Sequence, residues 1–192
     1  MKEDLANYIK QNKLFGKQDK LLLAISAGAD SVALSHLLKE LRYNISLAHC
    51  NFGLRNEQSD ADEFFVGELA KKWHVNCFTK KFKTKAFAKQ KKISIQMAGR
   101  ELRYNWFEQI RVENKFDFVV TAHHKDDDLE TFFINLIRGT SIKGLLGISS
   151  KTAKKVVRPL LFANKQEIRD YLQQNKIQFR EDSSNKEEKN LR

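Results

Sequence analysis

The sequence has few cysteines and no long apolar stretch, and both features narrow the class of protein. Its 192 residues include only Cys50 and Cys77, which are too few for a disulfide framework and too far apart for a Cys-x-x-Cys site. No run approaches the 18 apolar residues of a membrane-spanning helix. The first fifteen residues, MKEDLANYIKQNKLF, lack the apolar segment of a signal peptide. We therefore expect a soluble cytoplasmic protein with no membrane partner and with buried, reduced thiols.

Positive charge is in excess. Thirty-five Lys and Arg residues against 24 Asp and Glu residues give a formal net charge of +11. This excess favours a polyanionic partner such as RNA or DNA, with lysine-rich codon usage as the alternative explanation. Lysines concentrate in TKKFKTKAFAKQKK, residues 79–92, where Phe82 and Phe87 are interleaved with them. Ammonium groups suit attraction to the phosphate backbone better than base reading.

Short apolar runs alternate with helical patterns along the chain. Strands are expected at about 21–26, 45–50, 75–82, 116–121 and 156–161. Helices are expected at about 31–43, 58–72, 94–114, 125–137 and 165–175, after a short opening helix. Strands separated by helices form βαβ units. The predicted fold class is therefore α/β, with a doubly wound, mainly parallel five-stranded sheet, helices on both faces, and ligands at the carboxyl ends of the strands.

A polar turn, Ser26-Ala27-Gly28-Ala29-Asp30-Ser31, follows the first expected strand. A helix that begins after such a turn presents free N–H groups to an anion. Alternatively, Gly28 only permits the turn, and Asp30 or Ser31 caps the helix. One glycine and no lysine exclude a Walker loop and a dinucleotide fingerprint. A carboxylate repels phosphate unless a cation lies between them, so Asp30 implies Mg²⁺ if the ligand is a polyphosphate.

The segment AHHKDDDLET, after the fourth expected strand, carries the most potential chemistry. In a helix from Lys125, the side chains of Asp127, Glu130 and Thr131 share one face. The buried stripe of this helix is expected to be Leu129, Phe132, Phe133 and Leu136. Complementing the helix dipole is an alternative role for the aspartates. Zinc is disfavoured because no helical His-x-x-x-His pair or third soft ligand is present.

Together these segments resemble the PP-loop ATP pyrophosphatase superfamily, with an adenine nucleotide alpha hydrolase-like fold, and within it the tRNA(Ile)-lysidine synthetases. The matching segments follow the family's order over about residues 20–185: SAGADS, AHCNFGLRNEQSDADEFFV, AGRELRYNWF, AHHKDDDLETFFINLIRGT, VVRPLL and EDSSN. Two residues depart from the family pattern, Ala27 at a usual glycine and Phe52 at a frequent histidine. Ala27 should be tolerated if its φ is negative, whereas a positive φ at this position would count against ATP binding.

The resemblance implies an enzyme that uses ATP and Mg²⁺ to modify the wobble cytidine of tRNA(Ile) with a CAU anticodon. ATP would adenylate the base at its C2 oxygen and release pyrophosphate. The ε-amine of free L-lysine would then displace AMP and leave lysidine. Two alternatives stay open: another PP-loop tRNA-modifying or amidating ligase, and a non-catalytic basic RNA-binding module.

The resemblance also implies roles for individual residues. The ATP site would comprise Ser26, Ala27, Gly28, Asp30, Ser31 and Asn51, with Asp30 also on the metal. The catalytic residues would be Arg100 on the phosphates, His123 as acid–base or electrostatic stabiliser, and Asp127. The lysine site would comprise Asp127, Glu130 and Thr131. Residues 1–185 would form the catalytic domain and residues 186–192 would begin a C-terminal extension, and a homodimer is a further expectation.

Overall fold

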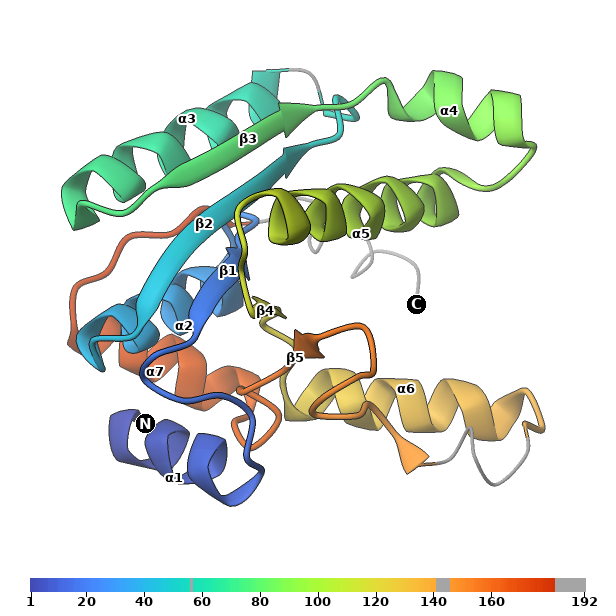
Figure 1. Ribbon diagram of the computed structural model, residues 1–192. Coiled ribbons are helices and arrows are strands. Elements are labelled where there is room, and N and C mark those ends of the chain that lie inside the picture. The colour runs from blue at the N-terminus through green and yellow to red at the C-terminus, as the bar shows by residue number, and fades with distance from the viewer. Residues whose placement is uncertain (56, 141–145, 182–192) are drawn as a thin grey trace.

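A five-stranded parallel sheet runs through the centre of the structure (Figure 1). The computed structural model describes residues 1–55, 57–140 and 146–181. The strands are β1 Lys20–Ala24, β2 Asn44–Asn51, β3 Cys77–Lys81, β4 Phe118–Val120 and β5 Val156–Val157. Their order is β3-β2-β1-β4-β5, and every pair is parallel. The predicted α/β class is thereby confirmed, and the order reverses at β1, so the switch point lies between β1 and β4.

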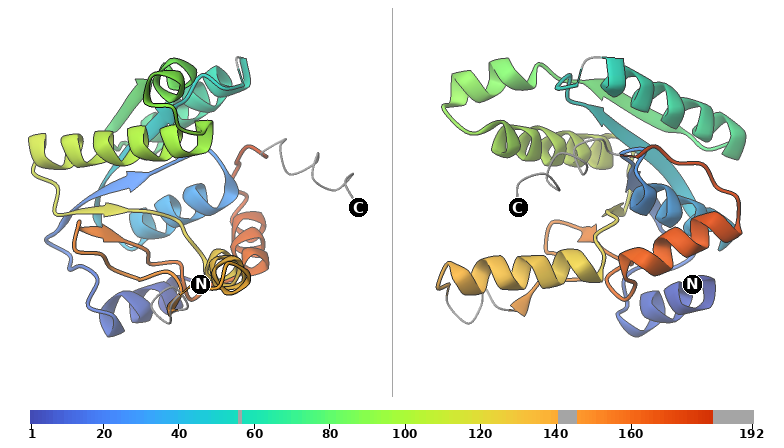
Figure 2. Two further views of the ribbon diagram at one scale, coloured as in Figure 1. Left: turned by 90° about the vertical axis from the view of Figure 1, so that its right-hand side faces the viewer. Right: turned by 180° about the vertical axis from the view of Figure 1, so that it is seen from behind.

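Helices cover both faces of this sheet (Figures 1 and 2). They are α1 Lys2–Gln11, α2 Ala29–Glu40, α3 Glu57–Trp73, α4 Thr84–Lys91, α5 Ile95–Glu113, α6 Lys125–Ile137 and α7 Lys165–Gln174. Alternate residues of β1 enter different cores, because side chains alternate across a strand. Leu21 and Leu23 belong to the larger core, whereas Leu22 packs in the core of Trp106 and Phe107 from α5. The apolar run in β1 therefore forms a strand buried on both faces, as predicted.

Helix α6 has the expected bounds but not the expected packing. None of its described residues is buried, and Leu129, Phe133 and Leu136 are 49%, 56% and 50% exposed. The predicted buried stripe is therefore wrong. The physical reason is visible in Figure 1, where α6 begins at the end of β4 and extends away from the sheet instead of lying across it.

Other expectations also need correction. Residues 84–91 form α4, a helix that the strand-and-helix pattern missed, with Thr84 and Ala88 on its buried side. Cys50 and Cys77 are free and half-buried rather than fully buried. The EDSSN segment beyond Glu181 and the expected extension at 186–192 lie outside the described residues. Within the described ranges, no helix is both long and apolar enough to cross a membrane.

Candidate active site

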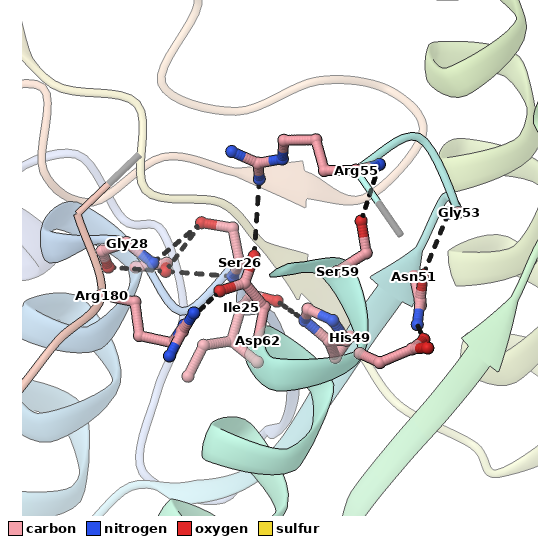
Figure 3. A network of polar contacts seen from close by, with 12 residues as sticks. Ile25, Ser26, Gly28, His49, Asn51, Gly53, Arg55, Ser59, Asp62 and Arg180 are labelled. Atoms are coloured by element: carbon pink, nitrogen blue, oxygen red, sulfur yellow. Dashed lines mark hydrogen bonds and ion pairs between the residues drawn. The ribbon is translucent and has the colours of Figure 1, made fainter. Parts of the chain in front are cut away.

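The turn after β1 forms a hydroxyl-braced loop at the N-terminus of α2 (Figure 3). The Oγ atom of Ser31 accepts a hydrogen bond from the backbone N–H of Ser26 at 3.1 Å and donates one to the carbonyl oxygen of Gly28 at 3.0 Å. Gly28 is the N-cap residue and makes no side-chain cap, so neither Asp30 nor Ser31 is the N-cap residue that the alternative interpretation required. The loop therefore presents the amino end of a twelve-residue helix, which suits an anion.

Ala27 adopts a left-handed conformation with φ of 72°. The condition under which alanine replaces glycine without strain, a negative φ, is therefore not met. A non-glycine residue pays on the order of 1 kcal/mol in this region, but Ala27 is fully buried. Its carbonyl oxygen also accepts a hydrogen bond from the backbone N–H of Arg180 at 3.0 Å. Tertiary contacts thus hold the loop in the shape that glycine would adopt without strain.

Asp62 of α3 ties the segment at Arg180 to the rest of the site (Figure 3). One carboxylate oxygen accepts from the Nε of Arg180, and the other lies 3.4 Å from a terminal nitrogen of Arg55. The Asp62 side chain is 14% exposed, whereas those of Arg180 and Arg55 are 38% and 39% exposed, so solvent reaches both ion pairs from the arginine side. This arrangement braces the turn between β1 and α2, residues 26–31, from the α3 side.

A cavity of about 280 Å³ opens between the ends of β1 and β4, next to this loop. It is lined by Ala24, Ile25, Ser26, Asp30, Ser31, Cys50, Phe52, Arg103, Tyr104, Phe107, Thr121, Ala122, His123 and Asp127. Five of the expected site residues are therefore brought together: Ser26, Asp30, Ser31, His123 and Asp127. The cavity combines a polar wall of loop, histidine and carboxylates with an apolar wall from α5 and Phe52, which is typical of small-ligand sites.

His123 follows β4 and faces several charged groups. Its Nδ1 atom lies 2.9 Å from the hydroxyl of Thr121, and this contact orients the ring. Burial lowers the pKa of His123 to about 4, and the positive charges of Arg158, Arg100 and Arg103 act in the same direction, whereas Asp127 opposes them. The imidazole is therefore neutral near pH 7 and serves as a hydrogen-bonding group instead of a cation.

Asp30 is a half-buried carboxylate of the site. Its Oδ1 atom has no hydrogen-bond partner among the described residues. Burial raises its pKa, and the nearby Asp127 also raises it, while His124 lowers it. The Nε2 atom of His124 lies 3.7 Å from the Oδ2 of Asp30 and 3.5 Å from the Oδ2 of Asp127. A buried oxygen atom without a partner, next to an anion-binding loop, fits the binding of a divalent cation.

The expected lysine-site residues are only partly joined to the cavity. Asp127 lines it and also accepts a hydrogen bond from the backbone N–H of His124 at 2.9 Å, so it helps to cap α6. Glu130 is exposed and Thr131 is half-buried, and neither lines the cavity. Both lie farther along α6 on the side that bears Asp127.

Two further expected residues lie outside the lining. Asn51 is 1% exposed, and its amide donates to Asp60 and Glu63 at 2.8 Å while its oxygen accepts from the N–H of Gly53 at 3.0 Å. Its amide therefore braces the turn after β2 (Figure 3), and contact with a nucleoside stays a prediction. Arg100 is exposed, with its guanidinium carbon 5.2 Å from the ring centroid of Tyr104.

Arg103 was not predicted as a site residue, but it lines the cavity, with its guanidinium carbon 5.2 Å from the ring centroid of Phe52. A signal was present, because Arg100 and Arg103 are three residues apart and share a face of α5. The aromatic wall of Phe52, Tyr104 and Phe107 was also missed. Tyr104 and Phe107 are three residues apart on α5, so a helical pattern connects them, but Phe52 comes from the turn after β2 and no local pattern links it to α5.

Comparison with known proteins shows which family this chain resembles. The model of the PP-loop domain family matches residues 1–192. The chain is 47% identical over 192 residues to tRNA(Ile)-lysidine synthase of Bacteroides thetaiotaomicron, covering 100% of this chain and 45% of that protein. It is 48% identical over 180 residues to the protein of the same name from Porphyromonas gingivalis strain W83, covering 93% and 40%. The chain thus spans less than half the length of these relatives.

Solved structures share the fold. The U34-tRNA thiolase NcsA from Methanococcus maripaludis, solved with its 4Fe-4S cluster, has a TM-score of 0.74 at 20% identity, over 94% of this chain and 64% of that one. The NH3-dependent NAD synthetase from Campylobacter jejuni has a TM-score of 0.59 at 17% identity, over 90% and 70%. Because the model of this family matches the whole sequence, residues 1–192, we conclude that this chain belongs to the PP-loop domain family.

Proposed function

We propose that this protein ligates free L-lysine to C2 of the wobble cytidine of tRNA(Ile) with a CAU anticodon, in two steps that consume ATP. The first step adenylates the C2 oxygen and releases pyrophosphate, and the second replaces AMP with the ε-amine of lysine. The observation that carries the proposal is the cavity in which the phosphate loop, His123 and Asp127 meet. The relatives named tRNA(Ile)-lysidine synthase support the same reaction.

Adenylation requires donors that face the phosphates. The loop supplies the hydroxyls of Ser26 and Ser31 and the N-terminus of α2. Arg103 in the lining and Arg100 one turn earlier supply positive charge. Negative charge builds on pyrophosphate as it leaves, so fixed cations and N–H donors aimed there accelerate the step most.

Mg²⁺ fits the cavity through Asp30. That carboxylate has a buried oxygen atom without a partner among the described residues, and oxygen ligands suit this ion. Mg²⁺, when bound with ATP, neutralises phosphate charge and offsets the repulsion between Asp30 and the phosphates.

His123 takes part as a neutral group. With its Nδ1 held by Thr121, its other ring nitrogen is left for the substrates. A pKa of about 4 makes it a weak base at neutral pH, so a hydrogen bond that orients a reacting group is its main role, with proton transfer secondary.

We assign the selection of lysine to the acidic side of α6, the side that bears Asp127 and Glu130. Asp127 faces the cavity, and Glu130 and Thr131 follow it on the helix. Carboxylates attract the α-ammonium group, and the hydroxyl of Thr131 adds a hydrogen bond, so the ε-amine is left free to attack.

The tRNA backbone is assigned to β3, α4 and the start of α5. Residues 77–100 contain seven lysines and one arginine and not one Asp or Glu. The lysines of α4 and its C-cap are exposed, namely Lys85, Lys89, Lys91 and Lys92. Gly99 of α5 lies against Phe52, so this basic surface adjoins the cavity wall. Phosphate attraction at this edge would deliver the anticodon loop to the cavity.

A thiolase is the less favoured alternative. Burial raises the pKa of Cys50 to about 12 and that of Cys77 to about 11, so both thiols are protonated at neutral pH and poorly nucleophilic. This chain contains two cysteines in all, fewer than the ligands of a 4Fe-4S cluster. Cytoplasmic location and a homodimer stay predictions.

One assay tests the proposed reaction. The protein is incubated with Mg²⁺, ATP, a tRNA(Ile) transcript with a CAU anticodon and radiolabelled lysine. We expect label on the RNA together with AMP and pyrophosphate, and, without lysine, pyrophosphate release alone. A transcript with a guanosine at the wobble position is the matched control. Label on both transcripts, or pyrophosphate release without any label on the RNA, would contradict the proposal.

A further inference from the structure

Arg158 is a buried cation that the reaction as described does not use. It follows β5 directly and is 9% exposed. One terminal nitrogen donates to the carbonyl oxygen of Ser149 at 2.6 Å, and its Nε has no partner in the described part of the chain. The arginine ion pairs of the described residues involve Arg55, Arg111 and Arg180, and none involves Arg158. A buried charge without a counter-ion is costly, and such a group is retained where it has a ligand to meet.

The sheet places this cation beside the catalytic histidine. Val120 of β4 is in register with Val157 of β5, and the N–H of Thr121 donates to the carbonyl oxygen of Val157 at 3.0 Å. Arg158 therefore lies next to Thr121, whose hydroxyl holds His123. Figure 2 shows β4 and β5 side by side at this edge of the sheet. The charge of Arg158 is also the largest charge effect on the pKa of His123 after burial.

Arg158 is separated from the phosphate loop. The loop follows β1, and β4 lies between β1 and β5. Two strand spacings amount to roughly 10 Å, so Arg100 and Arg103 are the better placed cations for ATP. Asp127, in contrast, begins the helix that follows β4, and it acts on His123 with the opposite sign to Arg158. A carboxylate and a guanidinium thus both lie within electrostatic reach of His123.

This pairing matches the two ends of an amino acid. An α-amino acid carries its ammonium and carboxylate groups on one carbon atom, so its site needs an acid and a base close together. Guanidinium matches a carboxylate through paired N–H donors better than any other side chain. The geometry points to Arg158 as the residue that binds the α-carboxylate of the incoming lysine, opposite the acidic side of α6. This assignment rests on the proposed function, which names lysine as the nucleophile.

The test compares three ligands that differ by one charged group. L-lysine has both groups, cadaverine lacks the carboxylate, and 6-aminohexanoate lacks the α-ammonium. Each is titrated against labelled lysine in equilibrium binding with ATP present, and each is also offered as nucleophile. In the unmodified protein we expect lysine to bind at least tenfold more tightly than cadaverine. Equal affinity for these two ligands would overturn the inference without any variant.

Two substitutions separate the two ends of the site. Arg158→Gln should lower the affinity for lysine and for 6-aminohexanoate by about ten- to a hundredfold. The affinity for cadaverine should stay within twofold of that of the unmodified protein. Glu130→Gln should lower the affinity for lysine and for cadaverine but not the affinity for 6-aminohexanoate. Arg169→Gln, on the exposed side of α7, is the matched control and should change none of them.

Other outcomes have defined meanings. Equal weakening of all three ligands by Arg158→Gln would assign Arg158 to holding the Ser149 turn and overturn the inference. Loss of ATP affinity with unchanged ligand preference would assign Arg158 to the phosphates and would overturn the inference as well. If the unmodified protein binds none of the three ligands and transfers no lysine, the proposed function itself fails. If Arg158→Gln does not fold, the comparison of lysine with cadaverine in the unmodified protein decides.

Discussion

The backbone N–H of Arg180 donates a 3.0 Å hydrogen bond to the carbonyl oxygen of Ala27, whose φ is 72°. A segment more than 150 residues later in the chain therefore holds Ala27, in the turn after β1, in a left-handed conformation that alanine does not favour. The same arginine binds Asp62 through its side chain, so one residue joins α3 to the loop.

Substitutions at Ala27 should expose this strain. Ala27→Gly removes the left-handed penalty but also removes a buried methyl group and loosens the unfolded chain, so the unfolding free energy should change by less than about 1 kcal/mol. Ala27→Val places a branched side chain at positive φ in a fully buried position, and should cost about 2 kcal/mol or more. Urea unfolding measures both. Equal stability of the valine variant and the parent would show that the loop is not held at positive φ.

The Asp30 carboxylate should lower the stability of the fold while it contributes to ligand binding. Because burial raises its pKa, the ionised carboxylate is less favourable in the folded protein than in water. Asp30→Asn should therefore leave thermal stability unchanged or raised, and abolish the Mg²⁺ dependence of ATP binding. Calorimetric titration of ATP across a Mg²⁺ series provides the measurement, and Asp170→Asn on α7 is a distant control. An Asp30→Asn protein that keeps the parent's Mg²⁺ dependence would remove Asp30 from the metal site.

His123 should make the protein acid-sensitive. The unfolded histidine titrates near 6.5 and the folded one near 4, so the unfolded state binds the proton first as pH falls. The stability contributed by neutral His123 is thus full above pH 6.5 and is lost towards pH 4, by up to roughly 3 kcal/mol. Melting temperatures from pH 7.5 to 4.5 should fall less steeply in His123→Asn. The control His74→Asn, at an exposed position, should follow the parent, and parallel curves for His123→Asn would refute the assignment.

The lysines at the end of α4 should contribute to RNA binding through charge. Replacing Lys89, Lys91 and Lys92 by Gln should weaken binding of the tRNA and flatten the slope of log K against log salt, by about 0.7–0.9 for each phosphate that is no longer neutralised. A control with Lys2, Lys39 and Lys71 replaced removes lysines that pair with glutamates. Filter binding at several salt concentrations gives the slopes. Identical slopes for the α4 variant and the parent would mean that these lysines only face solvent.

Local sequence patterns were sufficient for the fold class and for part of the site. Period and composition, which are properties of neighbouring residues, predicted three features: the apolar run of β1, the polar turn after it and the 125–137 bounds of α6. Because carboxyl ends of parallel strands share one edge, the same patterns brought Ser26, Asp30 and His123 together correctly.

Tertiary structure alone decided the conformation of Ala27, the exposed apolar side of α6 and the place of Arg103 and Arg158 beside His123. Each depends on which elements meet in space: Arg180 reaches Ala27, α6 extends beyond the sheet, and β5 lies against β4. A helical stripe specifies which residues share a face, but strand order and helix direction determine what that face contacts. Long-range packing therefore dominates the electrostatics of the cavity, because burial and the charges of Arg158, Arg100 and Arg103 lower the pKa of His123, while Asp127, four residues later in the chain, opposes them.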